Sequence, residues 1–66
     1  MSPWVESVVM KTLRELCGPL NKPISAGVLG YCLEQPKARR TAYNYLRELE
    51  QAGMVVRPSP RRWCEA

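Results

Sequence analysis

The sequence predicts a mainly α-helical domain that ends in a small β-hairpin. Three stretches carry apolar residues at the spacing of one helix face, and glycine or proline interrupts the chain between them. The C-terminal segment contains two short β-prone runs on either side of a proline-rich turn. With 66 residues, of which 45% are hydrophobic, the chain can build one compact core, so residues 1–66 are expected to form a single domain.

The first helix is expected over residues 3–17. Ser2 can cap it, and Pro3 suits the first helical position because its missing N–H is not needed there. Gly18 and Pro19 then end the helix, since glycine adopts the left-handed cap and proline cannot continue a helix. The stripe predicted to be buried comprises Val5, Val8, Val9, Leu13 and Leu16.

A second helix is expected over residues 26–34, with Ser25 as its N-cap. Gly30 lowers the intrinsic stability of this helix, and we expect it to permit the close approach of another helix. The apolar face that the spacing predicts comprises Val28, Leu29, Cys32 and Leu33.

The third helix, expected over residues 37–52, has the clearest periodicity in the chain. Gly53 is expected to end it as a left-handed cap. The turn that contains Pro36 brings no serine or threonine cap, so the start of this helix is predicted to be shifted or poorly capped. Tyr43 is assigned to the surface. The side predicted to be buried comprises Ala42, Tyr45, Leu46 and Leu49.

The C-terminal hairpin is predicted over residues 54–64. Pro58 and Pro60 cannot donate hydrogen bonds to a neighbouring strand, so the paired strands are expected to be short. Trp63 is expected to cover the hydrophobic core rather than to stack on a base.

The charge balance predicts an anionic partner. The net charge is +4 and the pI is about 9.3, which suits nucleic acid, an acidic protein or a lipid headgroup layer. No apolar run approaches the roughly 20 residues needed to span a bilayer, and the N-terminus lacks the pattern of a secretory signal. We therefore expect a cytoplasmic protein with no membrane partner.

The residue inventory argues against an enzyme and against a metal or cofactor site. The chain has no histidine and no glycine-rich phosphate loop, and its three cysteines form no C-x-x-C pair. Cys17 and Cys32 are expected to be small core residues, and Cys64 is expected to be a free thiol. An odd, sparse set of cysteines also argues against a disulfide framework.

One segment matches the pattern of a known family. Residues 46–55 read LRELEQAGMV and resemble the segment L-x-x-L-E-x-x-G-[LM]-V, which ends the recognition helix and opens the wing in winged helix-turn-helix regulators of prokaryotes and phages. Residues 23–29 resemble the short strand and second-helix start of that family, and residues 37–45 occupy the place of its recognition-helix stretch. The resemblance implies a three-helix winged helix-turn-helix domain that regulates transcription.

The exposed side of the third helix carries side chains that suit double-stranded DNA. Arginine can bond guanine bidentately and asparagine can bond adenine, so Arg40, Asn44 and Arg47 are predicted to read bases in the major groove. Basic side chains in the first turn of this helix and in the wing suit phosphate oxygens or the minor groove. The other predicted DNA contacts are Lys37, Arg39, Tyr43, Arg57, Arg61 and Arg62.

Two alternatives remain open from the sequence. A winged helix can also serve as a protein-interaction module within a larger assembly, and recognition of RNA or of a Z-form duplex is a third possibility. A palindromic DNA site would require a dimer, for which the apolar edge at Trp4 and Val5 of the first helix is the predicted contact.

Overall fold

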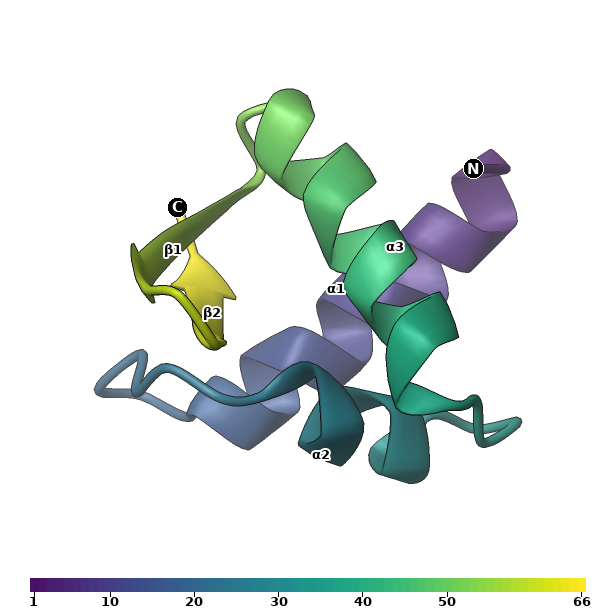
Figure 1. Ribbon diagram of the computed structural model, residues 1–66, viewed down its shortest axis with the longest axis horizontal. Helices are drawn as coiled ribbons and strands as arrows, with labels where there is room; N and C mark the ends of the chain where they lie inside the picture. The colour runs from purple at the N-terminus through teal and green to yellow at the C-terminus, as the bar shows by residue number, and fades with distance from the viewer.

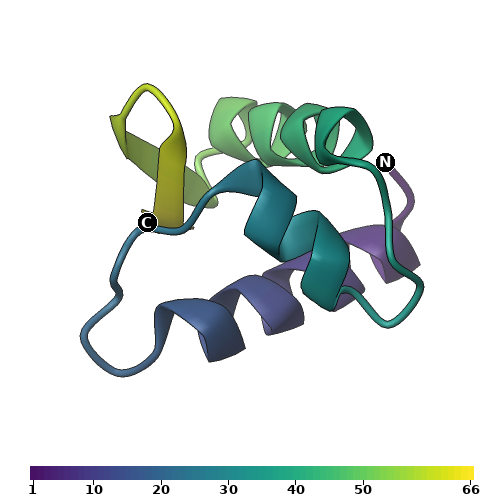
Figure 2. The ribbon, with the colours of Figure 1, turned by 60° about the horizontal axis from the view of Figure 1, so that its bottom comes forward.

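The computed structural model describes residues 1–66 and consists of three helices followed by a two-stranded antiparallel hairpin. This confirms the predicted mainly helical class with a C-terminal hairpin. In Figure 2, α1 runs beneath α2 and α3, and the hairpin stands beside α3, next to the segment that leads into α2. The elements are α1 (Pro3–Cys17), α2 (Ala26–Cys32), α3 (Arg39–Gln51), β1 (Val55–Ser59) and β2 (Arg62–Glu65).

Helix α1 has the predicted bounds and the predicted capping residues, but Gly18 departs from the predicted left-handed helical cap because its ψ is −172°. The Ser2 hydroxyl accepts a hydrogen bond from the Val5 N–H at 3.2 Å, and Gly18 ends the helix at a φ of 70°. The buried stripe lies slightly to one side of the predicted one, because Met10 and Cys17 face the core while three of the predicted residues border it. Those bordering residues are Val5, Val8 and Leu16.

Helix α2 ends at Cys32, two residues before the predicted end, because Leu33 is already extended. Its N-cap is Ser25, as predicted. The predicted apolar face is wrong in part, since Val28 is 44% exposed and Cys32 is also exposed. The helix instead turns its small residues, Ala26 and Gly30, inward together with Leu29, so residues about half a turn away face solvent.

Gly30 explains why α2 is oriented in this way. A Cβ atom at this position would lie 2.5 Å from the carbonyl oxygen of Lys37 and 3.3 Å from the Cβ of Ala42. The Lys37 N–H also donates a hydrogen bond of 2.9 Å to the Gly30 carbonyl. The predicted close approach of a neighbouring helix is therefore confirmed, and α3 with the turn before it is the neighbour.

Helix α3 begins at Arg39 rather than at residue 37, and it ends at Gln51 rather than at residue 52. Its N-cap is Ala38, whose side chain makes no capping hydrogen bond, so the predicted poor capping is confirmed. Lys37 is outside the helix, with its N–H already bonded to Gly30 as described above. Gly53 takes the predicted left-handed conformation at a φ of 76°.

The hairpin is irregular at its centre. Val56 pairs with Cys64 and Ser59 with Arg62, so Arg57 and Pro58 of β1 lie opposite the single residue Trp63 of β2. Trp63 forms an isolated bridge with Ile24 instead, and the two backbone hydrogen bonds of this bridge are both 2.8 Å long. The hairpin is therefore tied to the segment that precedes α2, as well as being joined to α3 through the chain.

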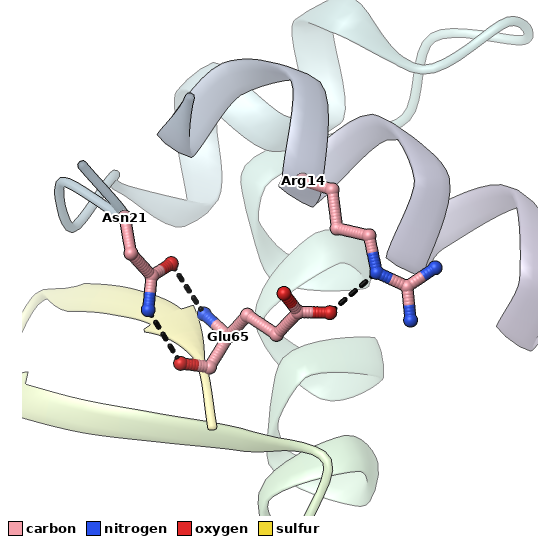
Figure 3. Close-up of polar contacts among 3 residues, drawn as sticks. All are labelled: Arg14, Asn21 and Glu65. Atoms are coloured by element: carbon pink, nitrogen blue, oxygen red, sulfur yellow. Dashed lines mark hydrogen bonds and ion pairs between the residues drawn. The ribbon is translucent and has the colours of Figure 1, made fainter. Parts of the chain in front are cut away.

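The end of β2 is also held by α1 and by the loop after it (Figure 3). The Asn21 side chain donates to the Glu65 carbonyl oxygen at 2.7 Å and accepts from the Glu65 N–H at 3.1 Å. The Glu65 carboxylate forms an ion pair with Arg14 of α1. These contacts fix the base of the hairpin and leave its turn, at residues 60 and 61, as the free end.

The hydrophobic core draws on all five elements. It contains no buried polar or charged side chain, and Trp63, which is 2% exposed, is the largest member, as predicted for a residue that covers the core. Its members are Val9, Met10, Leu13, Cys17, Ala26, Leu29, Leu33, Ala42, Leu46, Leu49, Val55, Trp63 and Cys64.

The three cysteines are free, but they do not share one environment. Cys17 and Cys64 are buried, whereas Cys32 is exposed, which corrects its assignment to the core. Burial raises the pKa of the Cys17 thiol, and the nearby Cys64 acts in the same direction.

No helix is long and apolar enough to cross a membrane.

Replacing Gly30 with alanine is expected to lower the free energy of unfolding by about 1–3 kcal/mol, because the added methyl group meets the backbone of Lys37. Gly27→Ala is the matched control on the same helix, since its Cβ would meet only the Arg39 side chain at 3.7 Å. That variant should gain up to about 1 kcal/mol from helix propensity. Urea denaturation measures both changes, and equal effects in the two variants would contradict the proposed role of Gly30.

In the native protein one thiol is expected to react quickly with an aromatic disulfide reagent and two slowly. Cys32 is exposed, while Cys17 and Cys64 are buried and Cys17 is further protected by its raised pKa, because the thiolate is the reacting form. Stopped-flow absorbance measures the two phases. Cys32→Ser should remove the fast phase alone, and a fast phase that persists in this variant would refute the assignment.

Candidate nucleic-acid interface

A basic cleft lies between the start of α2, the start of α3 and the turn of the hairpin. Figure 1 shows how these three elements are arranged along the chain. Its volume is about 1090 Å³, and it is lined by residues 25–28, 38–40 and 60–63 together with Tyr43. Two pairs of arginines, one from α3 and one from the hairpin, line this cleft. We call these residues the arginine cleft: Arg39, Arg40, Arg61 and Arg62.

The positive charge of the arginine cleft is not neutralised within the chain. The structure contains three ion pairs, which join the N-terminal ammonium to Glu48, Arg14 to Glu65 and Arg57 to Glu50. None of the four arginines takes part in them, and all four are exposed. The first turn of α3 contains no acidic residue, and the N-terminal end of a helix carries a partial positive charge of its own. The cleft therefore favours an anion.

The exposed side of α3 continues from the arginine cleft along the helix. Asn44 and Arg47 are exposed, and they lie four and seven residues after Arg40, which places all three on one face. On the opposite side Ala42, Leu46 and Leu49 are at most 1% exposed, as predicted. An arginine, an asparagine and a second arginine thus project from a helix that is anchored by its other face.

Tyr43 is not a free surface residue, which corrects its assignment from the sequence. It is half-buried, and its ring meets the ring of Trp63 edge to face, with centroids 5.4 Å apart and an interplanar angle of 84°. Its hydroxyl accepts a hydrogen bond from Arg57 at 3.3 Å. Tyr45, predicted to be a core residue, is also half-buried and packs against the core.

Arg57 differs from the two arginines of the hairpin turn. Its guanidinium forms an ion pair with Glu50 at 3.3 Å, donates to Tyr43 and lies 5.3 Å from the ring centroid of Trp63. The hydrogen bond to Tyr43 raises the pKa of Arg57, and the negative charge of Glu50 acts in the same direction. The three predicted wing arginines therefore divide into two exposed residues in the cleft and one that is held against α3.

Lys37 also lies apart from the arginine cleft. It lines a separate groove of about 300 Å³ whose other residues come mainly from α1 and from the turn after α2. Trp4, the predicted dimer contact, lies on this groove with 65% of its surface exposed. The remaining lining residues are Val5, Val8, Val9, Leu33, Glu34, Gln35 and Tyr45.

Two contributions to the site were not predicted from the sequence. One is the cluster that holds Arg57, and the other is the inclusion of the start of α2 in the cleft wall. A partial signal existed for the cluster, because Tyr43 and Glu50 are seven residues apart and must share a helix face. That spacing does not predict which face of the helix the hairpin covers.

The structure contains no group of three or more histidine, cysteine, aspartate or glutamate side chains that could hold a metal ion. The side chains at the candidate site present guanidinium, amide and phenol groups, which bind anions and hydrogen-bond acceptors. In comparisons with known proteins, the chain matches no family model, no curated protein and no solved structure.

Proposed function

We propose that the protein is a winged helix-turn-helix domain that binds double-stranded DNA, with α3 in the major groove and the hairpin turn on the phosphate backbone. In this proposal the domain is a small transcriptional regulator. The observation that carries the proposal is the arginine cleft, which adjoins the exposed face of α3 and has no acidic partner in the chain.

The order of the elements supports the proposal. A helix, a bridging segment, two further helices and a two-stranded hairpin follow one another, and the bridging segment pairs with β2 through Ile24 and Trp63. This is the order that the resemblance of residues 46–55 to the recognition helix and wing implies. In such domains the helix after the turn is the one that enters the major groove.

The distribution of charge supports it further. Seven of the ten lysines and arginines lie between residues 37 and 62, and no acidic residue occurs from 37 to 47. Duplex DNA releases counterions when cationic side chains neutralise its phosphates, so an unpaired basic surface gains affinity from this source. An acidic protein would gain from the same charge, but an asparagine amide between two arginines is an arrangement suited to base edges.

The groove beside Trp4 favours a second role, as an interaction surface. It is apolar, it lies away from the arginine cleft and it includes an exposed tryptophan, a residue type enriched at interfaces. This role is compatible with DNA binding, since a partner that used this groove would leave the arginine cleft free. Binding of such a partner is expected to be insensitive to substitution of Arg40 and Arg47, which do not line this groove.

The protein is expected to bind duplex DNA with an affinity that falls as salt is raised, by a factor set by the number of neutralised phosphates. Fluorescence anisotropy with labelled duplexes measures this salt dependence of the affinity. The first duplexes come from a random pool, and later ones are the sequences that binding selection enriches from it. Single-stranded DNA, duplex RNA and a Z-form duplex serve as competitors. If no duplex DNA binds in a salt-sensitive way, the proposal is refuted.

Replacing Arg40 and Arg47 with alanine together is expected to weaken binding to the selected duplex and to reduce its preference over other sequences. A good bidentate contact contributes about 1–3 kcal/mol of discrimination between bases. Lys11→Ala with Lys22→Ala is the matched control, because it removes the same charge from exposed positions outside the cleft. Equal losses of preference in both double variants would contradict the assignment of α3 as the reading helix.

Replacing Arg61 and Arg62 with alanine is expected to weaken binding to all duplexes alike. The slope of the logarithm of affinity against the logarithm of salt concentration should fall by about two, since each lost phosphate contact removes about one. The same anisotropy titrations, repeated at four or five salt concentrations, supply the slope. An unchanged slope would place the hairpin turn away from the DNA.

A further inference from the structure

We propose that Glu50 and Arg57 form a latch between α3 and the hairpin, and that this latch sets the position of the hairpin turn for DNA binding. Arg57 is then a positioning residue rather than a DNA contact. The inference rests on the proposed function for its consequence in binding, but the latch itself is a feature of the free protein.

A single guanidinium joins three elements at this point. Arg57 of β1 reaches Glu50 of α3 through Nη2 at 3.3 Å and Tyr43 of α3 through Nη1 at 3.3 Å. Glu50 and Tyr43 are seven residues apart, which is about 10 Å along a helix, so β1 is held at two separated points of α3. The guanidinium also lies 5.3 Å from the ring centroid of Trp63 on β2.

Arg57 makes these contacts from the irregular centre of the hairpin. Arg57 and Pro58 lie opposite Trp63 alone, and an extra residue of this kind redirects the side chains beside it. Trp63 cannot follow a movement of β1, because its backbone is bonded to Ile24 and its side chain is buried. The latch therefore fastens β1 between α3 and the fixed Trp63.

The hairpin turn lies beyond the latch, so its position depends on the latch. Arg61 is four residues further along the chain, which corresponds to roughly 13 Å of extended strand. Over such a length, a small rotation at Arg57 moves the turn by an ångström or more relative to the start of α3. The two pairs of arginines line one cleft only while this angle is kept.

Arg57 is poorly placed to bind phosphate itself. Its side chain is 28% exposed, and the Glu50 carboxylate beside it would repel a second anion. The latch therefore predicts a change in DNA affinity opposite to the one that charge alone predicts. Electrostatics alone predict that removing the negative charge of Glu50 strengthens DNA binding, whereas the latch predicts that it weakens binding.

The test compares Glu50→Gln with Glu48→Gln. Both substitutions remove one negative charge from α3, but Glu48 pairs with the N-terminal ammonium and forms no ion pair with the hairpin. Glu50→Gln is expected to weaken duplex binding about 2- to 30-fold, the usual range for residues that act through others. Glu48→Gln is expected to leave binding unchanged or to strengthen it. Circular dichroism at the assay temperature establishes that each variant is fully folded.

A double-mutant cycle separates the latch from a general loss of stability. In an Arg57→Gln background the latch is already open, so adding Glu50→Gln should no longer weaken binding and should act as Glu48→Gln does. A merely structural effect would instead add to the first loss. Additive losses would overturn the proposal, as would binding of the Glu50→Gln variant that is equal to or tighter than that of the wild type.

A measurement without DNA tests the latch independently of the proposed function. Backbone amide resonances of Ser59, Arg61 and Arg62 should shift in Glu50→Gln and in Arg57→Lys, since a lysine ammonium lacks the planar fork that reaches two partners. They should stay in place in Glu48→Gln. If the wild type binds no duplex, the proposed function fails and this comparison alone decides the latch, which unshifted resonances would overturn.

Discussion

The burial of Trp63 is the interaction on which the rest of the structure depends. Its backbone bonds to Ile24 join the hairpin to the segment before α2, and its ring covers the core that α1, α2 and α3 share. The same ring meets the ring of Tyr43 edge to face, and the guanidinium of Arg57 lies over it. The indole Nε1 is buried without a hydrogen-bond partner, a cost that the extensive packing of the ring must offset. In a small domain with few core residues, one large side chain that contacts all of these neighbours therefore does much to place the hairpin.

The separation of charge follows from how the acidic residues are used. Glu48, Glu50 and Glu65 each pair with a cation inside the molecule, and two of these pairs hold the ends of the chain against the helices. Exposed ion pairs of this kind contribute little to stability individually. Their larger effect is on the surface potential, because they remove negative charge from α3 and leave its arginines uncompensated. The positive potential of the proposed DNA-binding face thus depends on the pairing of the glutamates as well as on the positions of the arginines.

Most local structure was predictable from local chemistry. Ser2 and Ser25 cap the first two helices, Gly18 and Gly53 take positive-φ conformations, and the periodicity of α3 identifies its buried side. Predictions failed where two elements compete for the same space. The inward face of α2 was misassigned because the spacing favoured large apolar residues, whereas the approach of Lys37 and Ala42 required Gly30 to face inward. For the same reason Cys32 lies at the surface.

The sequence by itself determined the number and kind of elements, the ends of α1 and the concentration of positive charge after residue 36, because caps, breakers and charge are properties of single residues and their near neighbours. Only the tertiary structure decided which basic residues lie together. It brought Arg39 and Arg40 to the same cleft as Arg61 and Arg62, set Lys37 apart on another groove, and turned Arg57 inward. These outcomes depend on the angle between the hairpin and α3, which the contacts of Trp63 and Glu50 fix and which no local pattern encodes.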